Sequence, residues 1–299
     1  MKGLNRMLNK KFVAAVLVAS TSIFAQAADL TVINTGSKTG GFFRSSNALQ
    51  QDLGKSMSVE YVNPGQYCAA YAVLQKTTGP VLFPWANDFE AAGRSGEGCA
   101  TIPLKAEEIV SYTRDTYRVC SAKPEMTKER FIKAGESARV GYSTPAFAFE
   151  NTVQAVNKSF GTKHVGVTYE AGGGAVKTAL LNKEVDYVIL WPSFAQEVVS
   201  NGTANCFWST GKDTLDGMEG IAAKDLTNKK LIIGSDTVWL LKNATPAQAA
   251  SISKLVQAAY ADQNSAIAAQ IKKSSPPNFN KSKESIISDW EDAVNALKK

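Results

Sequence analysis

The chain has 299 residues, 44% of them hydrophobic and 20% charged, which is typical of a globular protein and excludes a disordered or collagen-like chain. The length favours about two domains, at roughly 150 residues each. The single histidine, His164, excludes every metal site that needs two histidine ligands.

The first 27 residues are expected to be a secretory signal peptide that is cleaved after Ala27. Basic residues lie within 1–11, an apolar run follows at 12–24, and Ala25-Gln26-Ala27 supplies the small residues that a signal peptidase reads. The alternative is an uncleaved N-terminal anchor, although the apolar run is too short to span a bilayer. We therefore expect a periplasmic protein.

The net charge of +6 gives no argument for nucleic-acid binding. Four of the 33 Lys and Arg residues lie in the leader, so the rest of the chain is close to balanced against its 27 acids. No later stretch approaches the roughly 18 apolar residues of a membrane span, so a soluble mature protein is expected.

The rest of the chain alternates predicted strands and helices, in two consecutive blocks of similar plan. This order predicts a mainly parallel sheet with right-handed crossovers in each block. Thr127 is the predicted cap of a helix that runs through Ala134, and Thr245-Pro246-Ala247-Gln248 is a predicted capping box. In chain order, the predicted strands cover 30–35, 59–62, 81–83, 108–113, 116–121, 139–142, 164–169, 187–191 and 237–241.

Four short loops rich in small and polar residues follow predicted strands, at 37–41, 63–65, 143–146 and 172–174. In open α/β sheets, ligands bind beyond the carboxyl ends of the strands. Helix N-termini at that edge present free N–H groups and a partial positive charge, which suit an anion. The alternative is that these loops are plain connections, since Gly and Ser suit any such turn.

Several catalytic and cofactor motifs are absent from the sequence. There is no dinucleotide-binding glycine fingerprint, no phosphate-binding P-loop and no nucleophile elbow. His164 begins a predicted strand and is expected to be a partly exposed structural residue. We therefore expect no metal, no cofactor and no enzymatic activity.

The four cysteines suit an exported chain. Their even number favours disulfides, and neither a C-x-x-C pair nor zinc-ligand spacing is present. Sequence alone leaves three connectivities open, with four buried free thiols as the alternative. The cysteines are Cys68, Cys99, Cys120 and Cys206.

The ordered set of these motifs resembles the substrate-binding proteins of tripartite tricarboxylate transporters, often called Bug receptors. The segment 30–33 with Gly40-Gly41 resembles that family's first strand and glycine loop, and 59–65 resembles its second strand and Asn-x-Pro-Gly turn. Residues 139–145, 165–173 and 244–246 are similar to later family segments. The resemblance runs from about Leu30 to about Lys272.

The resemblance implies an α/β protein with the two-lobed fold of a type II periplasmic binding protein, a Venus-flytrap. Each lobe would hold a mixed, mainly parallel sheet flanked by helices. Lobe one would comprise 28–111 plus 236–299, and lobe two would comprise 112–235. The disulfides Cys68–Cys99 and Cys120–Cys206 are then favoured, because each pair falls within one lobe.

The function implied by the resemblance is an extracytoplasmic receptor that captures a small carboxylate between its lobes. It would be a monomer that delivers this organic anion to the membrane permease subunits of a tripartite transporter, without nucleic acid. In the family, the counterpart of Asp186 organises waters at the far end of the ligand. The implied ligand contacts are Ser37, Thr39, Gly40, Gly41, Asn87, Ser143, Thr144, Ala146, Gly172 and Asp186.

Two alternatives to the receptor are a sensing module for a membrane sensor kinase and a secreted hydrolase with Ser143 as nucleophile. The chain also departs from the family's pattern. It carries Phe42, Phe43 and Arg44 in the first loop, where Arg44 and Lys38 are candidates to attract an anion. Trp85 and Trp191 end predicted strands, which predicts either an apolar contact with the ligand or core packing.

Overall fold

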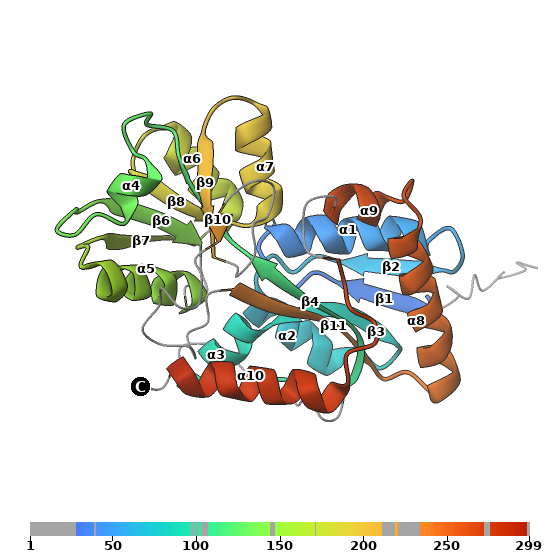
Figure 1. The fold of residues 1–299 in the computed structure, drawn as a ribbon. Coiled ribbons are helices and arrows are strands. Elements are labelled where there is room, and N and C mark those ends of the chain that lie inside the picture. Colours follow the sequence, from blue (N-terminus) through green and yellow to red (C-terminus); the bar gives the residue numbers. More distant parts are fainter. Residues whose placement is uncertain are drawn as a thin grey trace, which may run out of the picture.

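The computed structural model shows two β-sheets, each covered by helices on both faces (Figure 1). Within the described residues, no helix is both long enough and apolar enough to cross a membrane. The residues that the structure describes are 28–38, 40–96, 99, 101–102, 107–143, 147–170, 172–210, 219–220, 234–271 and 276–297. The predicted signal peptide, 1–27, lies outside them.

The first sheet has the strand order β2-β1-β3-β11-β4, in which β1, β2 and β3 are parallel and β11 runs antiparallel to β3 and β4. Its strands are β1 (Leu30–Ile33), β2 (Val59–Val62), β3 (Val81–Ala86), β4 (Glu108–Thr116) and β11 (Gly234–Lys242). Its helices are α1 (Gly41–Leu53), α2 (Tyr67–Lys76), α3 (Asn87–Ser95), α8 (Pro246–Ala261), α9 (Ala266–Ile271) and α10 (Lys283–Leu297).

The second sheet has the strand order β10-β9-β5-β8-β6-β7, in which β5 runs antiparallel to β8 and β9. Its strands are β5 (Arg118–Ser121), β6 (Arg139–Ser143), β7 (Val165–Tyr169), β8 (Tyr187–Leu190), β9 (Asn205–Ser209) and β10 (Glu219–Gly220). Its helices are α4 (Lys128–Phe131), α5 (Phe147–Phe160), α6 (Gly173–Leu181) and α7 (Pro192–Ser200).

Alternation along the strands of the first sheet builds one hydrophobic core on each face. On β3, Val81, Phe83 and Trp85 pack toward α2, α3 and α10, whereas Leu82 packs toward α1, α8 and α9. Trp85 is therefore fully buried in the first of these cores. Of the two roles predicted for this tryptophan, core packing is the one that the structure shows.

Both predicted helix caps are present. Thr245 and Gln248 form a reciprocal capping box at the start of α8, and Thr127 accepts a hydrogen bond from the Arg130 backbone N–H at the start of α4. The helix after Thr127 is shorter than predicted and ends at Phe131, because the chain turns at Ile132 and Gly135 takes a positive φ of 79°.

The chain passes between the sheets twice, at the border where β4 and β11 lie side by side (Figure 1). β4 continues to Thr116 before β5 begins at Arg118 in the second sheet, and the chain returns to the first sheet at Gly234. Both β4 and β11 thus extend past the limits expected of lobe one. The expected division into 28–111 plus 236–299 and 112–235 stays a proposal.

Two disulfides join the cysteines in the expected pairs. Cys120 and Cys206 are register partners on the adjacent strands β5 and β9, and Cys68 at the start of α2 is bonded to Cys99, beyond the end of α3. No cysteine of the chain is left free. Each disulfide joins two segments that belong to the same sheet or to the helices that cover it.

Reduction of these bonds is expected to lower the free energy of unfolding, because a disulfide restricts the unfolded chain. The double variant Cys120→Ala/Cys206→Ala is expected to lose about 2–4 kcal/mol in urea unfolding. The Cys68→Ala/Cys99→Ala variant removes the other disulfide, and its loss in the free energy of unfolding is compared with that of the first variant. Titratable thiols in the oxidised, unfolded wild-type chain would contradict the pairing.

Candidate functional site

Six parallel strands, three in each sheet, each lead into a helix that begins at the carboxyl end of the strand. β1, β2 and β3 precede α1, α2 and α3, and β6, β7 and β8 precede α5, α6 and α7. Five of these helices, all except α2, begin at one cavity between the two sheets. Their free N–H groups and dipoles make the backbone around this cavity electropositive.

The cavity encloses about 130 Å³ and is lined from both sheets. From the first sheet come the β1–α1 loop with Ser37, Gly40 and Gly41, and the first turn of α3. From the second come the end of β6 and the helix starts of α6 and α7. Six aromatic residues also line the cavity: Phe42, Phe89, Phe149, Trp191, Trp239 and Tyr260.

The β1–α1 loop is held in place by asparagine side chains. Asn34 Nδ2 donates to Asn63 Oδ1 (2.8 Å) and to the Gly36 carbonyl oxygen (2.9 Å), and Asn34 Oδ1 accepts from the Gly36 N–H (3.0 Å). The Thr35 hydroxyl donates to the Pro84 carbonyl oxygen at the end of β3. The loop at 63–65 therefore braces the first loop and does not itself line the cavity.

Gly172 brings the two sheets into contact across the cavity. It precedes α6 with a φ of 77°, and a Cβ placed on it would lie 2.2 Å from Ser37 Oγ and 3.7 Å from the Gly40 Cα. A Cβ at this position would force Ser37 Oγ to move, and an L-residue is also strained at this φ. The structure is therefore a closed arrangement of the two sheets.

Side chains of α1 and α7 form a second contact between the sheets. Arg44 donates to Glu197 (3.1 Å), and its guanidinium lies 4.2 Å from the centre of the Phe194 ring. Lys177 also donates a hydrogen bond to Glu197. This bond is the largest cause that lowers the pKa of Glu197 below its usual value, and Arg44 adds to the effect. The charge of Arg44 is therefore paired with Glu197 on α7, and Arg44 does not line the cavity.

The expected site residues divide into three groups. Five line the cavity together: Ser37, Gly40, Gly41, Ser143 and Gly172. Thr39, Thr144 and Ala146 lie outside the described residues. Asn87 and Asp186 are described, but neither of them lines the cavity.

Asn87 is the first residue of α3, and its side chain is 1% exposed. It lies beside the cavity and not on its wall. The next residue, Asp88, does line the cavity, so the structure shifts this part of the expected site by one position.

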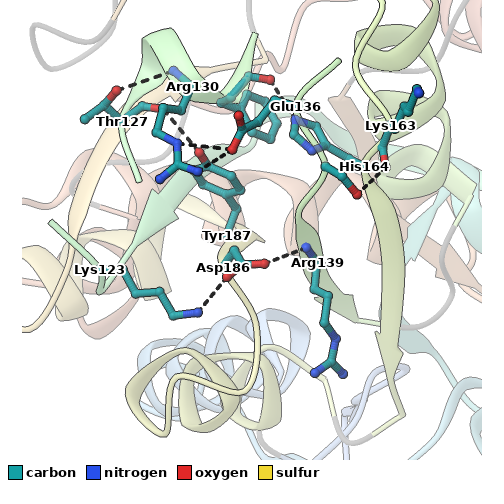
Figure 2. Close-up of polar contacts among 11 residues, drawn as sticks. Lys123, Thr127, Arg130, Glu136, Arg139, Lys163, His164, Asp186 and Tyr187 are labelled. Carbon is teal, nitrogen blue, oxygen red and sulfur yellow. Dashed lines mark hydrogen bonds and ion pairs between the residues drawn. The ribbon is translucent and has the colours of Figure 1, made fainter. Parts of the chain in front are cut away.

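Asp186 lies at the opposite end of the second sheet, one residue before β8 begins, and Figure 2 shows it between Lys123 and Arg139. Its carboxylate accepts from Lys123 Nζ (2.6 Å) and from the Arg139 backbone N–H (2.8 Å), and Arg139 is the first residue of β6. Partial burial raises the pKa of Asp186, but these two donors outweigh it and lower the pKa. The structure thus gives Asp186 contacts that tie strands together and does not bring it to the cavity.

His164 is also remote from the cavity and cannot assist Ser143. Ser143 is the last residue of β6, whereas His164 precedes β7, whose first residue pairs with the opposite end of β6. His164 is 5% exposed, more buried than expected, and its Nε2 donates to the Phe131 carbonyl oxygen (2.7 Å). The arrangement expected of a Ser–His hydrolase is therefore absent from this pair.

Sequence reasoning missed Asp88, the acid in the wall of the cavity. It is 4% exposed, and one of its oxygens accepts from the backbone N–H of Ala148 in the first turn of α5 (3.3 Å). Burial raises its pKa to about 7, and the nearby Asp236 adds to the effect, while Ala148 and Tyr117 oppose it. A signal was available, because Asp88 follows the carboxyl end of β3, where ligand-binding loops are expected.

Among the described residues that line the cavity, Asp88 and Asp115 are charged and there is no Lys, Arg or His. Hydroxyl groups are frequent there, from Ser37, Ser45, Ser143 and Ser193. No group of three or more His, Cys, Asp and Glu residues that could hold a metal is found in the described part of the chain. The polar groups available to a ligand are thus hydroxyl groups, backbone N–H groups and the carboxyl groups of Asp88 and Asp115.

No family model and no curated protein sequence matches the chain. Several solved structures do match its fold. MatC from Rhodopseudomonas palustris, solved with malate, has a TM-score of 0.64 at 13% identity and covers 90% of this chain and 97% of its own. A second R. palustris protein, solved with adipate, has a TM-score of 0.69 at 12% identity and covers 90% and 95%.

The periplasmic binding protein BugD is similar as well, with a TM-score of 0.66 at 14% identity, covering 90% of this chain and 94% of its own. These likenesses confirm the expected fold, that of a two-lobed periplasmic binding protein built from mixed α/β sheets.

The variant Gly172→Ala is expected to hold the two sheets apart, because the added methyl group meets Ser37 Oγ. Small-angle scattering should then give a larger radius of gyration than for the wild-type protein. Gly202→Ala is the matched control, since Gly202 has a φ of 64° and nothing within 4 Å of an added Cβ. Equal radii for the two variants would contradict the contact across the cavity.

The raised pKa of Asp88 predicts how stability depends on pH. Between about pH 4, where an unfolded Asp titrates, and about pH 7, the folded chain retains a proton that the unfolded chain has released. Raising the pH through this window therefore destabilises the wild-type protein at this residue. The free energy of unfolding of Asp88→Asn, relative to wild type, is expected to increase from pH 5 to pH 8 in urea titrations.

Asp186→Asn is the control for that measurement, because the pKa of Asp186 is lowered. Its ionised form stabilises the folded chain above the pKa of the unfolded residue, and this contribution disappears as the pH falls through the lowered pKa. The relative stability of Asp186→Asn should therefore not increase from pH 5 to pH 8. The same pH trend for both variants would contradict the assigned burial of Asp88.

Proposed function

We propose that the chain is an extracytoplasmic solute-binding receptor that captures a small carboxylate in the cavity between its two lobes. The observation that carries the proposal is the convergence of five helix N-termini on one cavity whose described lining has no basic side chain. A carboxylate would be held there by backbone N–H groups of these helices and by hydroxyl groups.

The proposed site comprises residues from both lobes. Ser37, Gly40 and Gly41 at the start of α1 would face Ser143 and Gly172 across the carboxylate. Thr39, Thr144 and Ala146 belong to the same loops and complete the proposed set. Asn87 is buried beside the cavity and stays a proposed site residue, and we leave Asp186 out because of its place at the far end of the sheet.

The size of the cavity supports a small ligand in a closed protein. Its 130 Å³ is close to the roughly 150 Å³ of an engineered cavity that holds benzene. Aromatic rings on both sides, including Phe42 and Trp191 with their centres 6.1 Å apart, would exclude water from the bound molecule. Malate and adipate, which two proteins of the same fold bind, are acids of this scale.

Binding and release would use a hinge motion of the lobes, with the divisions 28–111 plus 236–299 and 112–235. The contacts between Gly172 and Ser37 and between Arg44 and Glu197 would form on closure and break on opening. Arg44 and Glu197 are both about one-third exposed, so their ion pair contributes at most about 1 kcal/mol and leaves closure reversible.

We further propose that residues 1–27 direct the chain to the periplasm and are removed. There the closed receptor, as a monomer, would deliver its ligand to the permease subunits of a tripartite tricarboxylate-type transporter. Support for this location and partner comes from the fold shared with periplasmic solute-binding proteins. In this role the protein catalyses no reaction.

The experiment that tests the proposal is a thermal-shift screen of residues 28–299 against mono-, di- and tricarboxylates, with matched amides as uncharged controls. Ligand at 100 times its dissociation constant adds about 2.7 kcal/mol to the free energy of unfolding. At roughly 2–4 °C per kcal/mol, this gives a shift of several degrees. Shifts confined to acids support the proposal, and shifts with amides but not acids contradict it.

A further inference from the structure

Asp88 is difficult to explain in a cavity that only receives an anion. Its carboxyl group lines the cavity, is 4% exposed and has no ion-pair partner among the described residues. A buried carboxylate without a compensating cation is costly, and a carboxylate ligand beside it adds like-charge repulsion. The bound molecule must therefore supply a cation, or Asp88 must carry a proton.

The charged groups around Asp88 do not supply the missing cation. Asp236 on β11 is the acid that faces it, and the two oxygens of Asp236 accept from Arg114 Nε and a second Arg114 nitrogen, both at 2.7 Å. The Arg114 charge is thus already used by Asp236. From α5 the contact is the Ala148 N–H, and Glu150 is the charged residue of that helix turn.

The local backbone offsets part of the effect of burial on Asp88, so that its carboxyl group is ionised above about pH 7. Asp88 lies in the first turn of its own helix, α3, and accepts a hydrogen bond from the first turn of α5. Both helix dipoles therefore present their positive ends to the same carboxyl group. An N–H donor stabilises a carboxylate more strongly than a neutral acid.

We propose that the ligand of this cavity is a small carboxylate that also carries a protonated amine, with Asp88 as the residue that selects it. This inference rests on the proposed function and names the substrate class of the same site. The carboxylate lies at the starts of α1, α6 and α7, and the ammonium group lies against Asp88 at the start of α3. The two ends of the ligand are thereby distinguished by charge.

The test uses pairs of ligands that differ only in one amino group: succinate and L-aspartate, glutarate and L-glutamate, and adipate and L-2-aminoadipate. Isothermal titration of the wild-type protein at pH 8 is expected to show, for at least one pair, tenfold or tighter binding of the amino acid. Asp88→Asn should weaken binding of that amino acid at least tenfold and leave the plain acid unchanged or tighter.

Glu60→Gln is the matched control, because it removes one negative charge from an exposed position on β2, away from the cavity. It should leave both members of the pair unchanged. Circular dichroism and a melting curve establish that Asp88→Asn is folded, and if it is not, the wild-type comparison of the pairs decides alone.

Three outcomes overturn the inference. If plain acids bind as tightly as their amino partners, or more tightly, the ligand needs no ammonium group, and the receptor function still stands. An Asp88→Asn variant that binds both members more tightly shows that Asp88 acts as a protonated donor. If no acid of either kind binds, the proposed function itself fails and the inference fails with it.

Discussion

The direction of the strands is the constraint on which the rest of this structure depends. Because β1, β3, β6, β7 and β8 each lead directly into a helix, those five helices begin at the edges where the two sheets face each other. The aligned peptide dipoles then make the cavity favourable for an anion without a basic side chain. The backbone already provides this positive potential. The contact at Gly172 and the aromatic residues then surround a ligand bound there.

This constraint is also why much of the site could be predicted from sequence. Small and polar residues after predicted strands indicated the loops at 37–41, 143–146 and 172–174, since the carboxyl-end rule requires only the order of strands and helices. The loop at 63–65 satisfied the same rule but braces Asn34, because its helix, α2, does not begin at the cavity. Sequence order places a loop at an edge of a sheet and does not show which loops face the other lobe.

Asp186 and Trp85 show where sequence reasoning stops. Asp186 came from the family resemblance alone, and its position before β8 puts it at the amino end of the sheet, away from the cavity. Trp85 lies two residues beyond the predicted strand at 81–83, and alternation along β3 places it on the same face as Phe83, under α3 and α10. Asp88 was overlooked because β3 continues through Pro84 to Ala86, three residues beyond the predicted strand, which moves its carboxyl end to Asn87 and Asp88.

The measurement that tests the central claim most directly is a crystal structure of residues 28–299 with the tightest-binding acid of the screen. The account predicts that the ligand carboxylate lies within hydrogen-bonding distance of Ser37 or Ser143 and of the backbone N–H groups at the starts of α1 or α6. A ligand bound at the opposite end of the second sheet, beside Lys123 and Asp186, would contradict it.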